Sequence, residues 1–494
     1  MRDWRGRLLA LLMVAGLGGP AWAAPTDGLL KPCRIDGIPN ELKCGSLRRP
    51  LDPARPDGVA IDIGFLVVPA MARNKQPDAV LLLAGGPGQS AIKVASRVLP
   101  RLSRLNNRRD LVFVDQRGTG RSAPLECPDD SKLPLTEQLD GDAQMRRLDE
   151  CRAKLEALPY GRDGGLRFFT TTIAMQDMEA VRQALGVPQW NLIGASYGTR
   201  AALEYLRQFP GQVRRTVIDG VAPPDMVLPA SFSPDTQAAL DKLFAAHAAT
   251  HPQLRAEWEK LLASTPRTVT VAQPLTGVPE RFTVDRELLL RAVRPPLYQP
   301  ALAAALPAAI HAAAAEGRFE GLFGLSTAFG SAPGLRLAMG MHFSVMCAED
   351  VPRLATSTDA PGADYGRVDA ELYSRACRKW PRGEVPADFY KIPPAPSPVL
   401  VLSGGADPAT PPRHGERVAQ ALAVGHPGRV RHLVVPESGH GVMAVGCVRD
   451  LLFRFIDAPT EAEALPESLL KDAACATRIP RPPAFQPVQG GTAP

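Results

Sequence analysis

Residues 190–200 read Trp-Asn-Leu-Ile-Gly-Ala-Ser-Tyr-Gly-Thr-Arg, and this stretch decides the fold. A short apolar run ends in Gly194-x-Ser196-x-Gly198, and the residues that follow, 200–209, are compatible with a helix. A strand that turns this sharply into a helix needs glycine on each side of the serine, because a Cβ there would collide with the backbone. The serine takes a strained conformation that exposes its hydroxyl. The pattern predicts a nucleophile at Ser196, although the same motif also arises by chance in loops.

The partners that a nucleophilic serine needs follow later in the chain. A serine hydroxyl requires an imidazole to take its proton and an acid to orient that imidazole. Asp407 follows an apolar strand predicted at 399–402, and His440 follows one predicted at 430–435. The order serine, acid, histidine is that of an α/β-hydrolase. The alternative for Asp407, which lies among prolines, is a turn or helix-capping role. His414 and His432 are interpreted as structural or solvated.

A negative charge that develops on the attacked carbonyl oxygen needs N–H donors held in place beforehand. One predicted donor is the backbone N–H of Tyr197, directly after the serine. The other is predicted in the glycine-rich turn 85–88, at Gly86, because this turn follows a buried strand ahead of Ser196. The alternative is an ordinary glycine turn.

Apolar strands alternate with helical segments on both sides of a long insertion. This alternation predicts an α/β-hydrolase fold, a doubly wound and mostly parallel sheet, with an inserted helical cap. Strands are predicted at 59–68, 79–84, 111–114 and 216–219 before the insertion, and residues 123–165 read as polar and irregular. The predicted parts are 24–222 (core, first part), 223–395 (cap), 396–458 (core, second part) and 459–494 (C-terminal extension).

The N-terminus reads as a secretory signal peptide over residues 1–23. Arg2, Arg5 and Arg7 precede a short apolar segment, 8–17, and Ala21-x-Ala23 has the pattern of a cleavage site. An uncleaved anchor is the alternative. We expect a secreted or periplasmic protein with no stable membrane association after cleavage.

Eight cysteines fit an oxidising compartment. They fall in couples that are adjacent in the sequence, so four local disulfides are expected: Cys33–Cys44, Cys127–Cys151, Cys347–Cys377 and Cys447–Cys475. A metal site is the alternative, but no C-x-x-C pair occurs. No metal or cofactor is therefore expected. The net charge of +6 is mild and no basic run alternates with aromatic residues, so a nucleic-acid partner is not expected.

Four motifs, in order, resemble those of the proline iminopeptidase / tripeptidyl aminopeptidase family of serine peptidases. They are Gly85-Gly86-Pro87-Gly88-x-Ser90, Asp115-Gln116-Arg117-Gly118-x-Gly120-x-Ser122, Gly194-x-Ser196-Tyr197-Gly198 and Asp407-x-x-Thr410-Pro411. The likeness covers most of residues 60–458, and the C-terminal extension with Cys475 resembles that of the secreted tripeptidyl branch. Position 84 is alanine where the iminopeptidases carry histidine, which favours the tripeptidyl-type branch.

The resemblance implies a secreted serine aminopeptidase that cleaves short peptides from a free N-terminus through an acyl-enzyme. An esterase or another small-molecule hydrolase is the alternative, because this fold does not fix the substrate. A non-catalytic binding protein on the same fold is the third possibility. An aminopeptidase needs carboxylates for the substrate ammonium, and we expect Glu349 or Asp350, with Glu349 preferred. An exposed acidic turn is the alternative for this pair.

Overall fold

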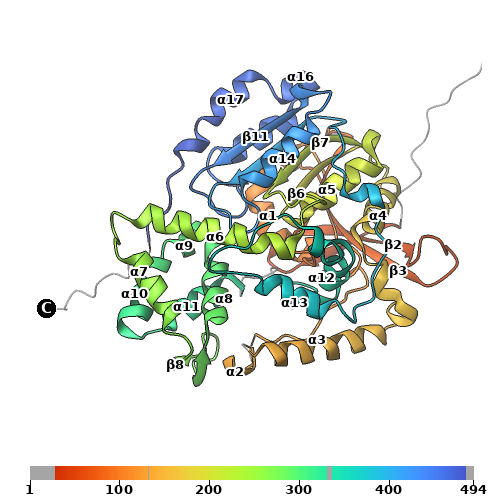
Figure 1. Ribbon diagram of the computed structural model, residues 1–494. Helices are drawn as coiled ribbons and strands as arrows, with labels where there is room; N and C mark the ends of the chain where they lie inside the picture. The colour runs from red at the N-terminus through yellow and green to blue at the C-terminus, as the bar shows by residue number, and fades with distance from the viewer. Residues whose placement is uncertain (1–27, 132, 139, 331–335, 485–494) are drawn as a thin grey trace, which may run out of the picture.

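The computed structural model describes residues 28–131, 133–138, 140–330 and 336–484 (Figure 1). The predicted signal peptide, 1–23, lies outside these residues. A nine-stranded sheet forms the centre, in the order β1-β2-β3-β5-β4-β6-β7-β10-β11. Its strands are β1 (Leu30–Ile35), β2 (Ile38–Pro50), β3 (Ala60–Val68), β4 (Ala79–Leu83), β5 (Leu111–Val114), β6 (Trp190–Ala195), β7 (Val213–Asp219), β10 (Val399–Gly404) and β11 (Val430–Val435).

Within this sheet, parallel pairing runs from β5 through β4, β6, β7 and β10 to β11. Strands β1, β2 and β3 join the β5 side in antiparallel pairs. Every residue of β4, β5 and β10 is buried, as strands covered by helices on both faces must be. The prediction of a mostly parallel sheet is confirmed. Strands β1 and β2, which precede the first predicted strand, extend the sheet at this edge.

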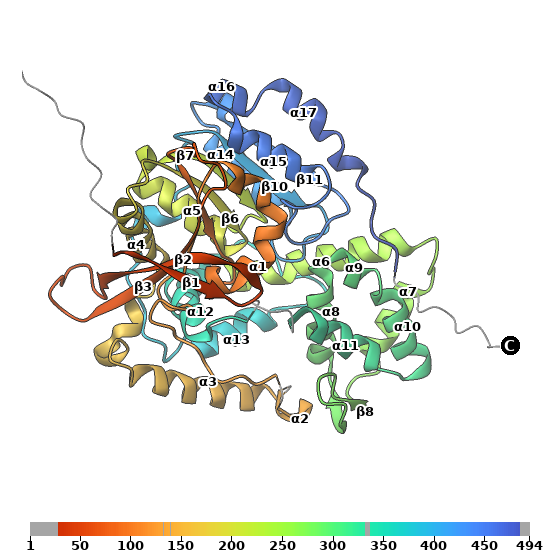
Figure 2. The same ribbon diagram turned by 180° about the vertical axis from the view of Figure 1, so that it is seen from behind.

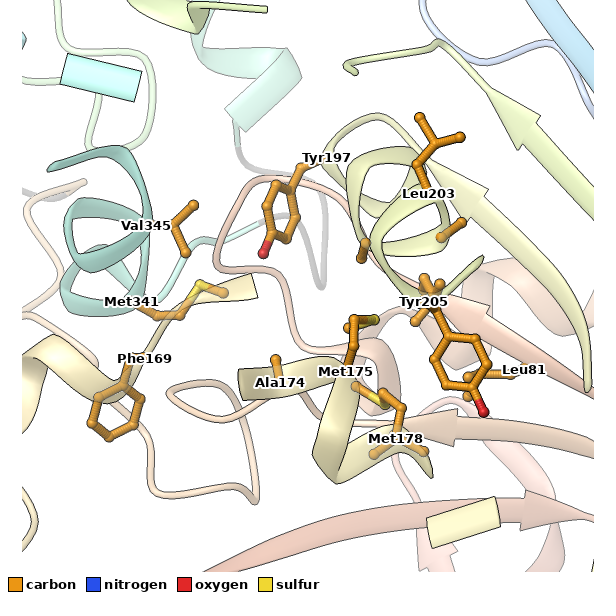
Figure 3. Packing of buried hydrophobic residues seen from close by; sticks show 14 of the residues in the cluster. Leu81, Phe169, Ala174, Met175, Met178, Tyr197, Leu203, Tyr205, Met341 and Val345 are labelled. Carbon is orange, nitrogen blue, oxygen red and sulfur yellow. The ribbon is translucent and has the colours of Figure 1, made fainter. Parts of the chain in front are cut away.

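Successive side chains of the parallel strands point to opposite faces, and each face has its own layer of helices. Leu82 and Phe113 pack with α1 (Ala91–Leu102) and α15 (Val448–Asp457). On the other face, Leu81 and Val112 pack with α4 (Thr171–Ala184), α5 (Tyr197–Gln208) and α14 (Pro412–Leu422). Figure 3 shows part of this second cluster, which includes Tyr197 of α5 and Met341 of the insertion. The sheet is therefore doubly wound.

Between β7 and β10 the chain builds a second layer over one end of the sheet (Figures 1 and 2). It has an apolar core of its own, which includes Leu240, Trp258, Leu289 and Phe319. Its helices are α6 (Leu228–His247), α7 (Leu254–Ala263), α8 (Arg286–Leu297), α9 (Pro300–Ala303), α10 (Leu306–Glu316), α11 (Glu320–Gly330), α12 (Met339–Val345) and α13 (Val368–Ala376). The cap is not purely helical, because β8 (Arg267–Ala272) and β9 (Pro279–Val284) form an antiparallel hairpin within it.

The expectation of an irregular segment at 123–165 is wrong. This segment contains α2 (Leu135–Gln138) and α3 (Gly141–Glu156), and the side chain of Asp140 caps the N-terminus of α3. Few of the side chains of α3 are buried, so its sequence lacks the apolar periodicity that marks a core helix. Arg375 of α13 forms an ion pair with Asp142 of α3, at 2.7 Å. Helix α3 therefore packs beside the cap.

The four expected disulfides are present, with the expected pairing. Cys447–Cys475 joins the start of α15 to the C-terminal extension, where α16 (Glu461–Ala464) and α17 (Glu467–Ala473) lie. Cys347–Cys377 closes a loop within the cap. Within the described ranges, no helix combines the length and the apolar character needed to cross a bilayer.

Candidate active site

The turn between β6 and α5 has the geometry that its glycines predict. Ser196 lies at φ 56° and ψ −126°, a conformation that residues with a Cβ rarely adopt. A Cβ on Gly194 would overlap the carbonyl of Gly198, and a Cβ on Gly198 would overlap the carbonyl of Leu83. The N–H of Ser196 donates to the carbonyl of Asp219, at 2.9 Å, which ties the turn to the end of β7. Helix α5 begins at the next residue, Tyr197.

Asp407 and His440 meet at the same edge of the sheet, after β10 and β11. Their Oδ2 and Nδ1 atoms lie 2.8 Å apart, and Asp407 is buried. Burial alone would raise the pKa of Asp407, but His440 and the N–H groups of Thr410 and Ala409 hold the pKa of that carboxyl below its usual value. Burial would lower the pKa of His440, but the carboxylate of Asp407 raises it above the usual value.

Gly220 shows how close this pair lies to the serine turn. It directly follows Asp219, whose carbonyl binds the N–H of Ser196. A Cβ on Gly220 would lie 3.2 Å from Cε1 of His440 and 3.1 Å from Oγ1 of Thr410. A single glycine at the end of β7 thus lies between the serine turn and the histidine, and a Cβ at this position would be crowded by His440 and Thr410.

The turn 85–88 lies against Ser196, as a source of oxyanion donors must. A Cβ on Gly85 would be 3.2 Å from Cβ of Ser196, and Gly86 has a φ of +110°. Two contacts from the cap hold this turn. Nδ1 of His342 lies 3.0 Å from the carbonyl of Pro87, and the N–H of Ala338 donates to the carbonyl of Gly88, at 2.8 Å.

The cap also contacts the loops that carry the acid and the histidine. The N–H of His440 donates to the carbonyl of Tyr298, at 2.9 Å, and the two rings meet edge to face with centroids 5.1 Å apart. Lys242 of α6 donates to the carbonyls of Gly405, at 3.1 Å, and of Pro436. Sequence reasoning missed these residues, because contacts between distant segments leave no local pattern.

Glu349 and Asp350 are not placed as the sequence interpretation requires. Both are buried, and Asp350 binds Arg200 through both oxygens, at 2.8 and 3.0 Å. Glu349 accepts from the N–H and the hydroxyl of Thr171, at 2.8 and 3.0 Å, and lies 3.3 Å from Arg200. Burial raises the pKa of Glu349 to about 7, against the opposing effect of Arg200. Internal partners occupy both carboxylates in this structure, so neither is free to bind a substrate ammonium.

The other histidines considered have partners away from the serine turn. Nε2 of His414 lies 2.8 Å from Asp235, and Nε2 of His432 lies 2.9 Å from the hydroxyl of Ser403. Asp219, by contrast, lies beside the site and was missed. The sequence could have indicated it, because Asp219 is the last residue of a strand and polar site residues commonly lie at the carboxyl ends of parallel strands.

A model of the alpha/beta hydrolase fold family matches residues 78–446. This match covers most of the chain and includes the serine turn and the loops that carry Asp407 and His440. The chain therefore belongs to the α/β-hydrolase fold family.

Three curated proteins are similar in sequence to this chain. Tripeptidyl aminopeptidase of Streptomyces coelicolor is 32% identical over 202 residues, which cover 39% of this chain and 37% of that protein. Serine protease Hip1 of Mycobacterium tuberculosis is 32% identical over 212 residues, 39% of each chain. The chain thus matches less than two fifths of the length of these relatives. Carboxylesterase B of Mycobacterium tuberculosis is 28% identical over 432 residues, covering 77% of this chain and 78% of that protein.

Among solved structures, proline iminopeptidase of Mycobacterium smegmatis is 18% identical and covers 87% of this chain and 100% of its own, with a TM-score of 0.34. The fold assignment rests on the family match. The resemblance to tripeptidyl aminopeptidases, inferred from four motifs, is confirmed by relatives of that name.

Proposed function

We propose that this protein is a secreted serine aminopeptidase that hydrolyses short peptides from a free N-terminus. The observation that supports this most is the 2.8 Å contact between Asp407 and His440 at the sheet edge that carries the strained Ser196. The amine specificity rests on the relatives named tripeptidyl aminopeptidase. Secretion rests on the predicted signal peptide and on four disulfides, which are typical of oxidising compartments.

The proposed chemistry follows from the hydrogen bonds of His440. Nδ1–H of His440 donates to Asp407, so Nε2 keeps its lone pair and can take the proton of Ser196. Ser196 Oγ then attacks the scissile carbonyl, and the N–H groups of Gly86 and Tyr197 stabilise the oxyanion. His440 returns the proton to the leaving amine, and a water molecule hydrolyses the acyl-enzyme by the same route.

An esterase is the second candidate, because the relative named Carboxylesterase B aligns over 77% of this chain. A peptidase acts on an amide, whose leaving group is poor, whereas an esterase needs only an activated ester. The two candidates therefore differ in the amide bond and in the requirement for a free amine.

The test compares three chromogenic substrates: an aminoacyl arylamide with a free amine, the same compound N-acetylated, and an aryl acetate. The proposal predicts turnover of the free arylamide with kcat/KM about 10- to 100-fold above that of the acetylated compound, of the order of a hydrogen bond to a charged group. Hydrolysis of the ester alone would support the esterase. Analysis of products from a tripeptidyl arylamide shows whether one residue or three are released.

A further inference from the structure

Asp219, the last residue of β7, contacts both parts of the proposed site. Its backbone carbonyl accepts from the N–H of Ser196, at 2.9 Å. Its carboxylate accepts from the N–H of Val442 through both oxygens, at 2.9 and 2.8 Å, and from the N–H of Met443, at 2.7 Å. One residue therefore holds the serine turn on one side and, on the other, the segment that directly follows His440.

Asp219 is 1% exposed. Placing a charge in such a position costs free energy unless hydrogen bonds compensate for the loss of water. The hydrogen bonds that the structure gives to this carboxylate come from backbone N–H groups, which hold the histidine loop in one place. The same carboxylate lies close enough to His440 to affect it electrostatically.

We propose that Asp219 is a positioning residue, which fixes the histidine loop relative to Ser196 and whose negative charge favours the imidazolium form of His440 during catalysis. The proposal rests on the proposed function, since it acts through Ser196 and His440. It assigns to Asp219 a role separate from that of Asp407, which binds the ring of His440 directly.

The charged groups around Asp219 set the expected pH dependence. Burial raises the pKa of Asp219, and the nearby Asp407 also raises it. The N–H groups of Val442 and Met443 and the charge of His440 lower it, and the resulting pKa is about 6. His440 is affected in turn by burial, which lowers its pKa, and by Asp407 and Asp219, which raise it. Removing the charge of Asp219 therefore lowers the pKa of His440, so the neutral base persists to lower pH.

The test is the variant Asp219→Asn, which keeps the shape but replaces one acceptor oxygen by an amide NH₂ that cannot accept from an N–H. We expect kcat on an aminoacyl arylamide to fall about 10- to 100-fold, of the order of a hydrogen bond to a charged group. KM should change little, and the acid limb of kcat/KM should move to lower pH. Asp62→Asn, at an exposed position of β3, is the matched control and should behave as the parent enzyme.

A parental kcat, or a lower kcat with an unshifted acid limb, would overturn the proposal, because a purely structural residue leaves the pKa of His440 unchanged. If Asp219→Asn does not fold, Asp219→Glu takes its place. It keeps the charge but displaces the loop, so kcat should fall with the acid limb unshifted, and a parental kcat would contradict the proposal. Labelling of the parent enzyme by an organophosphonate is measured first: its absence at Ser196 contradicts the proposed function itself, and with it this inference.

Discussion

At the scale of single residues, close contacts with the backbone explain which positions the sequence could identify. The glycines on either side of Ser196 have no room for a Cβ, and such a requirement appears in the sequence as a short motif. Asp407 and His440 could be predicted because each lies in the loop that follows a strand, at the same sheet edge. Gly439 is similar, since a Cβ there would overlap the carbonyl of Tyr298.

The pair Glu349 and Asp350 shows where residue-scale reasoning fails. Two adjacent acids beside a cysteine indicate a fixed acidic segment, but not which cation they bind. Arg200 lies on the helix that follows Ser196, far away in the sequence, and it binds both carboxylates. The pairing depends on how the cap docks on α5, which no local pattern reveals.

Glu349→Gln gives a prediction for stability. The pKa of Glu349 in the folded protein, about 7, is above its ordinary value, so its contribution to stability is present below about pH 4.5 and is lost as the pH rises through about 7. Glutamine does not titrate. We therefore expect the variant to gain stability relative to the parent protein between pH 5 and pH 8, measured by urea unfolding.

Glu371→Gln, at an exposed position of the cap, is the control and should show no such trend. The variant Glu349→Gln should also affect free-amine peptides and neutral esters alike. A selective loss of activity on free-amine peptides would instead restore Glu349 as the group that binds the substrate ammonium.

At the scale of elements, strands and helices with strong apolar patterns were predictable, and helices held mainly by polar contacts were not. Fully buried strands such as β4 and β10 match their predictions to within two residues. Helix α3 was missed because most of its surface is polar. The hairpin β8–β9 was missed because a two-stranded sheet inside a helical layer has only a short alternating pattern.

Helix α6 carries a prediction for the cap. Lys242 donates to the carbonyls of Gly405 and Pro436, one in the acid loop and the other in the histidine loop. Lys242→Met keeps the apolar stem of the side chain but leaves these carbonyls without their donor. We expect the free energy of unfolding to fall by about 1 kcal/mol and kcat to fall roughly tenfold through displacement of the loops.

Lys260→Met, at an exposed position of α7, serves as the control for this change and should have no effect on either quantity. Parental kinetics for Lys242→Met would mean that the two loops keep their places without the cap.

At the scale of the whole molecule, the order of apolar strands along the sequence predicted that the sheet is interrupted and then resumes. The structure confirms this, since β7 and β10 are neighbours in the sheet although about 180 residues separate them. The local pairing of cysteines could also be predicted. How the cap sits on the sheet could not, because this depends on contacts such as Tyr298 with His440 and His342 with Pro87.

The disulfides provide a prediction at this scale. Peptide mapping of the mature protein without reduction should give four links and no free thiol, with Cys347 joined to Cys377. The double variant Cys447→Ala/Cys475→Ala should lose about 2–4 kcal/mol of stability, because this link closes a long loop in the unfolded chain. A link between two different couples, such as Cys127 to Cys347, would contradict the structure.

The central claim is that Ser196 is the activated nucleophile of the whole molecule, and covalent labelling tests it most directly. The parent protein is treated with an organophosphonate, and the modified peptide is identified by mass spectrometry. We predict modification at Ser196, no labelling in Ser196→Ala, and a loss of turnover in that variant of roughly 10⁶-fold, as in other serine hydrolases. Labelling at another residue, or turnover that persists in Ser196→Ala, would contradict the account.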